Sequence, residues 1–264
     1  MLRATLRRMA KLTAYLAELE AQGRYYFTTE EAVAELREPI SRVRAALRKA
    51  KTRGEVVDPH RSFHVILPHE HRGMGCLPAE ELVPPLMQHL HEPYYVALLS
   101  AAEIYGAAND EDVFQVMARM TRKPISCGKS LVQFVGRKDL DQTPLREKST
   151  SAGPLRIASP EATALEMVGY AEQCGGLEHV ARVISALVQT LDAERLVEIA
   201  PANPIAWSQR LGYLLDVTDN RRLANALVPV VKTLAQDFAP LVRARPKAGA
   251  NRVARWKLAV NAAV

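Results

Sequence analysis

The spacing of apolar residues along the first fifty positions predicts three helices. The apolar residues that recur at three- and four-residue steps are Leu6, Met9, Leu12, Leu16 and Leu19. This spacing predicts one amphipathic helix that ends at Gly23. A short aromatic strand follows over residues 25–27, and Thr28 or Thr29 is expected to cap a second helix, with Glu30 and Glu31 at its positive N-terminal end.

The third helix is predicted from Pro39 to Lys51, with a proline suited to its first turn. Its apolar side is expected to hold Ile40, Val43, Leu47 and Ala50. The opposite side and its flanks carry Ser41, Arg42, Arg44, Ala45, Arg48, Lys49 and Lys51. A helix selected for solubility usually mixes charges of both signs, whereas residues 40–53 hold six basic residues and no acidic one. This composition fits a helix in a DNA major groove, with a small residue facing the bases.

Two β-rich runs, residues 55–57 and 63–67, flank Asp58-Pro59 and predict a hairpin with His60 and Arg61 at its tip. Helix, strand, helix, helix and hairpin is the order of a winged helix-turn-helix, which binds DNA through its third helix and its wing. The expected DNA-binding residues are Thr28, Thr29, Ser41, Arg42, Arg44, Ala45, Arg48, Lys49, Lys51, His60 and Arg61. The alternative is a small α+β module that binds another protein.

Residues 68–85 are rich in Pro, Gly and His and are expected to connect two domains. Beyond them the pattern predicts short strands over 113–117, 131–135 and 155–157, then helices from Ser159-Pro160-Glu161 to about Phe238, and a closing strand over 255–260. The predicted fold class is therefore α+β. A winged helix-turn-helix domain over 1–75 precedes a mixed α/β, mostly helical domain over 76–264.

Three segments of this second part carry a resemblance to a known family. They are Tyr94-Tyr95-Val96-Ala97-Leu98-Leu99-Ser100-Ala101-Ala102-Glu103-Ile104-Tyr105-Gly106, Ser159-Pro160-Glu161-Ala162-Thr163 and Gln209-Arg210-Leu211-Gly212-Tyr213-Leu214-Leu215. With the winged head before them, the chain resembles AbiEi-type antitoxins. The resemblance implies an autorepressor that binds repeats in its own operon promoter. It also implies a body that counters a nucleotidyltransferase-like toxin in abortive infection, a bacterial phage defence.

Charge divides the chain into a basic head, an acidic middle and a basic tail. The net charges of residues 1–62, 63–237 and 238–264 are +5, −5 and +6. The tail contributes a possible second basic patch, Arg243, Arg245, Lys247 and Arg252. Three roles are open for this patch: it could bind a further stretch of DNA backbone, complement an acidic partner, or remain solvated.

Composition adds expectations about the compartment. No apolar run is long enough to cross a membrane, and the basic start lacks the apolar core of a secretory signal. Cys76, Cys127 and Cys174 are few, widely spaced and odd in number, which implies neither a disulfide framework nor a zinc knuckle. A cytoplasmic protein is expected.

The candidate chemical motifs are weak. Gly128-Lys129-Ser130 ends like a phosphate-binding loop, but Lys123 stands where that motif needs glycine. The pairs His69/His71 and His89/His91 lack a third ligand at a suitable spacing. We therefore expect no catalytic site, metal or cofactor. The alternative functions are a nucleic-acid-processing enzyme tethered by the winged head, and a transcription regulator that responds to a small ligand.

Overall fold

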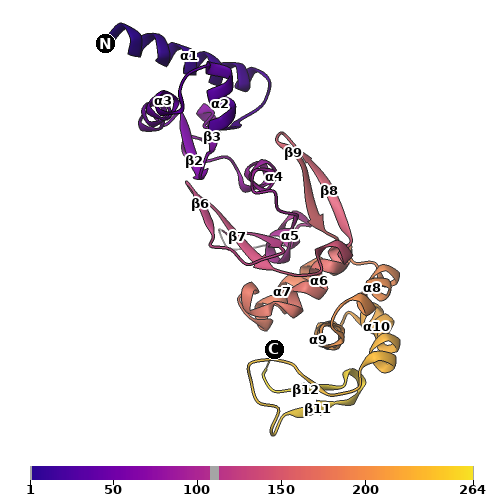
Figure 1. The fold of residues 1–264 in the computed structure, drawn as a ribbon. Helices are drawn as coiled ribbons and strands as arrows, with labels where there is room; N and C mark the ends of the chain where they lie inside the picture. Colours follow the sequence, from indigo (N-terminus) through magenta and orange to yellow (C-terminus); the bar gives the residue numbers. More distant parts are fainter. Residues whose placement is uncertain (1, 108–112, 264) are drawn as a thin grey trace.

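The computed structural model describes residues 2–107 and 113–263, and the side chains from Lys11 onward. The chain forms an N-terminal unit of three helices and a small sheet, followed by a body with a larger sheet and a helical layer. A small C-terminal sheet completes the body, and it lies at the opposite end of the molecule from the N-terminal unit (Figure 1).

The N-terminal unit has the predicted order of elements. They are α1 (Leu2–Ala21), β1 (Tyr26–Thr28), α2 (Thr29–Leu36), α3 (Ile40–Thr52), β2 (Val56–His60) and β3 (Phe63–Ile66). The strands form an antiparallel sheet in the order β1-β3-β2. The hydrophobic periodicity correctly predicted Leu12, Leu16 and Leu19 as core residues, and they pack with Val43 and Leu47 of α3. The side chains of Leu6 and Met9 lie outside the described part.

Two details of this unit differ from the prediction. Ile40 was expected in the core but is 43% exposed; it is the first residue of α3, and the buried apolar residues of the helix begin at Val43. Strand β2 continues through Asp58-Pro59 to His60, so the hairpin turns at Arg61-Ser62, where Ser62 has a φ of 59°. Proline is tolerated there because β2 is an edge strand.

The expected connector over 68–85 is only partly a loop. It contains the single turn η1 (His69–His71) and the first part of helix α4 (Ala79–His89), which includes Pro84 and Pro85. An internal proline costs a helix about 3 kcal/mol. Burial of Leu82, Val83 and Leu86, each 0% exposed, offsets that cost. Tertiary packing therefore overrides the local signal that predicted a loop.

The body is built on a six-stranded mixed sheet with the order β6-β7-β5-β4-β9-β8. Its strands are β4 (Tyr94–Val96), β5 (Val113–Ala118), β6 (Ile125–Cys127), β7 (Ser130–Gly136), β8 (Leu145–Thr150) and β9 (Gly153–Ala158). The pairs β5–β7 and β4–β9 are parallel, and the other neighbours are antiparallel. The three strands predicted here are confirmed. The sequence did not predict β8, because that edge strand is polar and mostly exposed.

Helices cover the sheet and fill the rest of the body, as predicted. They are α5 (Leu98–Ile104), α6 (Pro160–Gly169), α7 (Leu177–Leu187), α8 (Ala193–Ile199), α9 (Ile205–Val217) and α10 (Arg221–Leu234). Ser159 caps α6 by accepting a hydrogen bond from Ala162 N over 3.2 Å. The C-terminal sheet contains β10 (Ala239–Pro240), β12 (Leu258–Val260) and β11 (Asn251–Val253). The closing strand is thus shorter than predicted, and fully buried Trp256 precedes it in a 3-10 turn, packed against Gly212 of α9.

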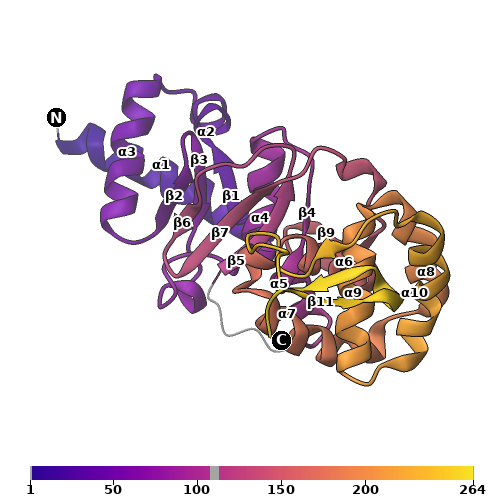
Figure 2. The same cartoon turned by 90° about the horizontal axis from the view of Figure 1, so that it is seen from below.

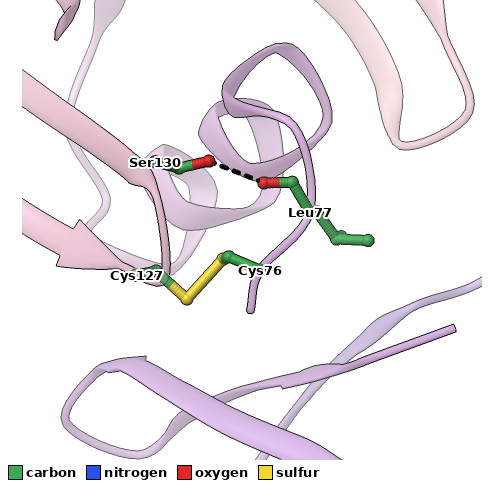
Figure 3. Close-up of a disulfide and its surroundings, with 4 residues drawn as sticks. All are labelled: Cys76, Leu77, Cys127 and Ser130. Atoms are coloured by element: carbon green, nitrogen blue, oxygen red, sulfur yellow. Dashed lines mark hydrogen bonds between the residues drawn. A yellow bond between two sulfur atoms is a disulfide. The ribbon is translucent and has the colours of Figure 1, made fainter. Parts of the chain in front are cut away.

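A disulfide joins Cys76, at the start of the body, to Cys127 at the end of β6 (Figure 3). The two Cα atoms are 5.5 Å apart, although 51 positions separate the residues in the sequence. Beside the disulfide, Ser130 Oγ donates a hydrogen bond to Leu77 O over 2.9 Å. The expectation of no disulfide framework is wrong for this pair, because cysteine spacing says nothing about which distant segments the fold brings together.

The N-terminal unit and the body share a hydrophobic core. Phe63 and Val65 point from β3 into the same cluster as Leu82 and Leu86 of α4 and Val132 of β7. Phe27 and Ile66 face the other way, toward α1 and α3. The small sheet therefore has one face in each core, and β3 fixes the N-terminal unit against the body.

Candidate nucleic-acid interface

The side chains of Thr28 and Thr29 have structural roles at the start of α2. Thr28 Oγ1 accepts a hydrogen bond from Glu31 N over 3.1 Å, and Thr28 N donates to Glu31 Oε2 over 2.7 Å, so the two residues form a capping box. Thr29 is 3% exposed and its hydroxyl lies 2.8 Å from His64 Nε2. Thr28 thus caps α2 as predicted, whereas Thr29 is not on the surface that the other candidates share.

Helix α3 lies at the end of the molecule farthest from α8 and α10 (Figures 1 and 2). It carries most of the predicted DNA-binding residues on one exposed face. Ser41, Arg42, Arg44, Arg48 and Lys49 are exposed, and Ala45 and Lys51 are half-buried. Val43, Leu47 and Ala50 anchor the opposite face in the core. The helix is therefore amphipathic as predicted, with its apolar side buried and its basic side in solvent.

Carboxylates outside α3 neutralise part of its basic surface. Arg42 Nη1 lies 3.2 Å from Glu38 Oε2, and Lys51 Nζ forms an ion pair with Asp58. Arg44, Arg48 and Lys49 have no carboxylate partner among the described side chains. These three unpaired cations, together with Ser41 and Ala45, are the part of the predicted set that is best placed to meet an anionic polymer.

A chain of polar contacts holds α3 against the hairpin and α2. Asp58 of β2 binds Lys51 with one carboxylate oxygen and lies 2.6 Å from His64 Nδ1 with the other. His64 Nε2 in turn reaches Thr29 at the start of α2. Burial would raise the pKa of Asp58, but the hydrogen bonds from His64 and Lys51 outweigh it and hold that pKa below its usual value. The sequence did not indicate Asp58 and His64 as positioning residues, since the residues of this chain of contacts lie on four separate elements.

The tip of the hairpin is turned toward the body. His60 is half-buried, with its ring centroid 5.5 Å from that of His89 on α4, and His89 Nε2 lies 3.0 Å from Arg61 O. Burial and the neighbouring His89 lower the pKa of His60. The Arg61 side chain is exposed. Of the two predicted tip residues, only Arg61 is therefore presented to solvent.

The second basic patch lies in and around the C-terminal sheet, at the opposite end of the molecule from α3 (Figure 1). Lys247 Nζ donates a hydrogen bond to Phe238 O over 2.8 Å, and the Arg252 guanidinium lies 5.2 Å from the centre of the Phe238 ring. Arg243 lines a cavity beside α7. The structure thus keeps the tail cations on the body and does not bring them to the basic face of α3.

A buried polar cluster forms the centre of the body. Glu166 of α6 is 1% exposed, and its Oε1 accepts hydrogen bonds from Tyr95 Oη and Arg137 Nη1, each over 2.6 Å. Arg137 Nη2 also donates to Asn203 Oδ1 over 3.0 Å. Burial raises the pKa of Glu166 to about 7, against the opposing effect of Arg137. The cluster is enclosed and links three elements, which is the arrangement of a structural centre.

The remaining chemical motifs occupy ordinary structural positions. Gly128 and Lys129 form the turn between β6 and β7, so a strand begins at Ser130 where a phosphate-binding loop needs a helix. Within residues 2–107 and 113–263, no three His, Cys, Asp or Glu side chains gather as a metal site. No helix in the described ranges is long and apolar enough to cross a membrane.

The fold and this surface define a mixed α+β protein with a basic helical face at one end. Comparison with known families finds one match, which lies within the body. Residues 95–217 match the sequence model of the AbiEi antitoxin C-terminal domain. This match confirms the resemblance to AbiEi-type antitoxins and supports a role in a toxin–antitoxin system. No curated protein sequence matches the chain significantly.

Solved structures extend the comparison to the whole fold. The RV2827C protein from Mycobacterium tuberculosis is similar over 96% of this chain and 90% of its own, with a TM-score of 0.69 and 17% identity. A nucleotidyltransferase-like protein from Paracoccidioides brasiliensis covers 56% of this chain and 89% of its own, with a TM-score of 0.36 and 11% identity. The antibiotic-resistance factor ANT(2'')-Ia covers 45% and 85%, with a TM-score of 0.31 and 12% identity. Only the first similarity is high enough to define a common fold.

Proposed function

We propose that this protein is a DNA-binding antitoxin that represses its own operon, and that residues 1–75 act as a winged helix-turn-helix. In this proposal α3 enters the major groove, α2 crosses the backbone and the β2–β3 hairpin is the wing. The body, residues 76–264, counters a nucleotidyltransferase-like toxin. No catalytic step, metal or cofactor is required of this chain, and both activities are placed in the cytoplasm.

The observation that carries the proposal is the set of cations on α3 that have no carboxylate partner among the described side chains. Arg44, Arg48 and Lys49 lie on an exposed helix face next to Ser41 and Ala45, whereas Arg42 and Lys51 are already paired with carboxylates. Several cations without carboxylate partners repel one another on one helix face. Binding to DNA is favourable for them because its phosphates supply the opposite charge. The adjoining AbiEi antitoxin domain supports an operon promoter as the DNA.

Gel-shift titration on the protein's own promoter tests the proposal. The full-length protein is expected to shift the promoter in preference to a scrambled duplex of equal length. Replacing Arg44, Arg48 and Lys49 with alanine is expected to abolish that preference. Equal binding of both duplexes by the intact protein, or an unchanged preference in the triple variant, would remove the groove-helix assignment.

A further inference from the structure

A cavity of about 280 Å³ lies in the body, far from α3. Its walls come from the end of α6, the start of α7, α9 and the segment after β10, which passes beside α7 (Figures 1 and 2). The residues that matter for its chemistry are Tyr170, Gly176, Leu177, Arg210, Leu241 and Arg243. This combines an apolar wall with two guanidinium groups.

Arg210 of α9 is the central feature of the cavity. Its side chain is only 7% exposed, and its Nε donates a hydrogen bond to Pro240 O over 3.1 Å. In the part of the chain that the structure describes, its two terminal nitrogens have no hydrogen-bond acceptor and no carboxylate partner. Neither terminal nitrogen is among the fully buried unpartnered atoms of the described residues, so both keep contact with the open space of the cavity. Those terminal N–H groups are therefore available to an acceptor that enters the cavity.

The surroundings of Arg210 increase the positive potential. Arg243, an exposed residue on the cavity rim, also has no carboxylate partner among the described residues. Burial, together with the nearby Arg243, lowers the pKa of Arg210. Glu172 also lines the rim but forms no ion pair with either arginine. Two guanidinium groups that border one cavity, neither of them in an ion pair with Glu172, indicate a site for an anion.

The start of α7 contributes to the same wall. Gly176 precedes the first residue of this 11-residue helix, and no side chain caps it. The first-turn N–H groups of a helix lack acceptors within the helix and attract anions. Gly176 and Leu177 line the cavity that Arg210 and Arg243 also line, so the helix end and the two guanidinium groups border one space.

We propose that this cavity binds a small phosphate monoester, with its phosphoryl oxygens on Arg210 and Arg243. A planar guanidinium offers paired N–H donors that match phosphate oxygens. Val168, Tyr170 and Leu241 provide the wall for the organic part of the ligand. The volume of about 280 Å³ is just below the range for small-molecule sites, about 300–1,000 Å³, which suits a small ligand. This site is separate from α3 and does not depend on the proposed DNA-binding function.

Isothermal titration calorimetry on the full-length protein tests the site with inorganic phosphate, ribose 5-phosphate and ribose as probes. Ribose 5-phosphate is expected to bind and ribose is expected not to bind. Tighter binding of ribose 5-phosphate than of inorganic phosphate would mean that the organic part is recognised. Equal affinities would assign the site to the phosphate group alone. Both results support a phosphoryl site.

Substitutions decide whether the two arginines hold the probe. Arg210→Gln is expected to weaken binding of ribose 5-phosphate at least tenfold, and Arg243→Gln several-fold. Arg245→Gln, an exposed neighbour that does not line the cavity, is the matched control and is expected to leave affinity unchanged. Because Arg243 is exposed, its variant retains the fold and remains informative if Arg210→Gln does not fold.

Three results would overturn the proposal. The first is no binding of either phosphate probe at millimolar concentration. The second is unchanged affinity in the Arg243→Gln variant. The third is displacement of ribose 5-phosphate by an oligonucleotide without terminal phosphates, which would show that the cavity takes phosphodiester backbone instead of a monoester.

Discussion

Arg137 Nη1 donates a hydrogen bond to Glu166 Oε1 over 2.6 Å at the centre of the body, where the Glu166 side chain is 1% exposed. Tyr95 Oη donates to the same oxygen, and Glu166 Oε2 has no hydrogen-bond partner in the described structure. One carboxylate oxygen thus joins β4, α6 and the segment after β7. The other oxygen is buried without compensation, which favours the neutral form of the carboxyl group.

This arrangement predicts a pH dependence of stability. Because burial raises the pKa of Glu166 to about 7, the folded protein binds a proton there that the unfolded chain has released. The contribution of this proton to the free energy of unfolding is fully present below about pH 4.3, the pKa of a glutamate in the unfolded chain. It is lost as the pH rises through about 7, the pKa of Glu166 in the folded protein. Urea unfolding of the intact protein between pH 5 and 8 is expected to show a decrease of up to about 3 kcal/mol. The Glu166→Gln variant should show a flatter profile, and an identical slope in both proteins would contradict the prediction.

The second prediction concerns the contribution of α3 to DNA affinity. Replacing Arg44, Arg48 and Lys49 with alanine is expected to lower promoter affinity by about 1–3 kcal/mol for each arginine that reaches a base. The slope of log K against log salt should become shallower by about 0.9 for each cation that reaches a phosphate. Fluorescence anisotropy at several salt concentrations measures both quantities. The matched control is alanine at Arg182, Arg195 and Arg222, three exposed body residues, which should bind as the intact protein does.

The third prediction concerns the basic tail. Changing Arg243, Arg245, Lys247 and Arg252 to glutamine would reduce the salt slope by roughly 3–4 units if all four met phosphate. We expect no change, because these residues lie at the far end of the molecule from α3, and Lys247 and Arg252 already contact Phe238 (Figure 1). A decrease of one unit or more, with the sequence preference intact, would place the tail on DNA. An unchanged slope assigns it to the body or to a partner protein.

The fourth prediction separates repression from antitoxicity. In the proposed division of roles, the Arg44, Arg48 and Lys49 triple variant loses promoter repression but still rescues cells from the co-expressed toxin. A reporter fused to the promoter measures repression, and colony counts during toxin induction from an unrelated promoter measure rescue. Loss of rescue in a variant that is as stable and abundant as the intact protein would mean that antitoxicity also depends on DNA binding.

The fifth prediction concerns the disulfide between Cys76 and Cys127. Closing a loop of 51 residues stabilises a fold by about 4 kcal/mol in the chain-entropy model. Reductant is therefore expected to shift the urea midpoint of the intact protein to lower concentration. Cys76→Ser with Cys127→Ser should have the lower midpoint at the outset and not respond to reductant. A Cys174→Ala variant retains the disulfide and should respond as the intact protein does.

Local sequence signals determined most of the elements of this protein. The helical spacing of Leu12, Leu16 and Leu19, the capping residues Thr28 and Ser159, and the single-sign face of α3 each act within one or two turns of chain. Such short-range patterns are visible in the sequence because the partners lie within a few residues of one another. The segments that carry the resemblance to AbiEi-type antitoxins are likewise continuous in the sequence.

Only the tertiary structure decided the features that depend on distant partners. It paired Cys76 with Cys127, placed Glu166 beside Arg137, turned His60 toward His89 and enclosed Arg210 without a carboxylate. It also buried Leu82, Val83 and Leu86 strongly enough to form a helix across two prolines. These outcomes depend on which segments pack together, and long-range packing energy can outweigh local preference. The sequence therefore determined the individual elements and their surface charge, and the packing of those elements determined which side chains meet.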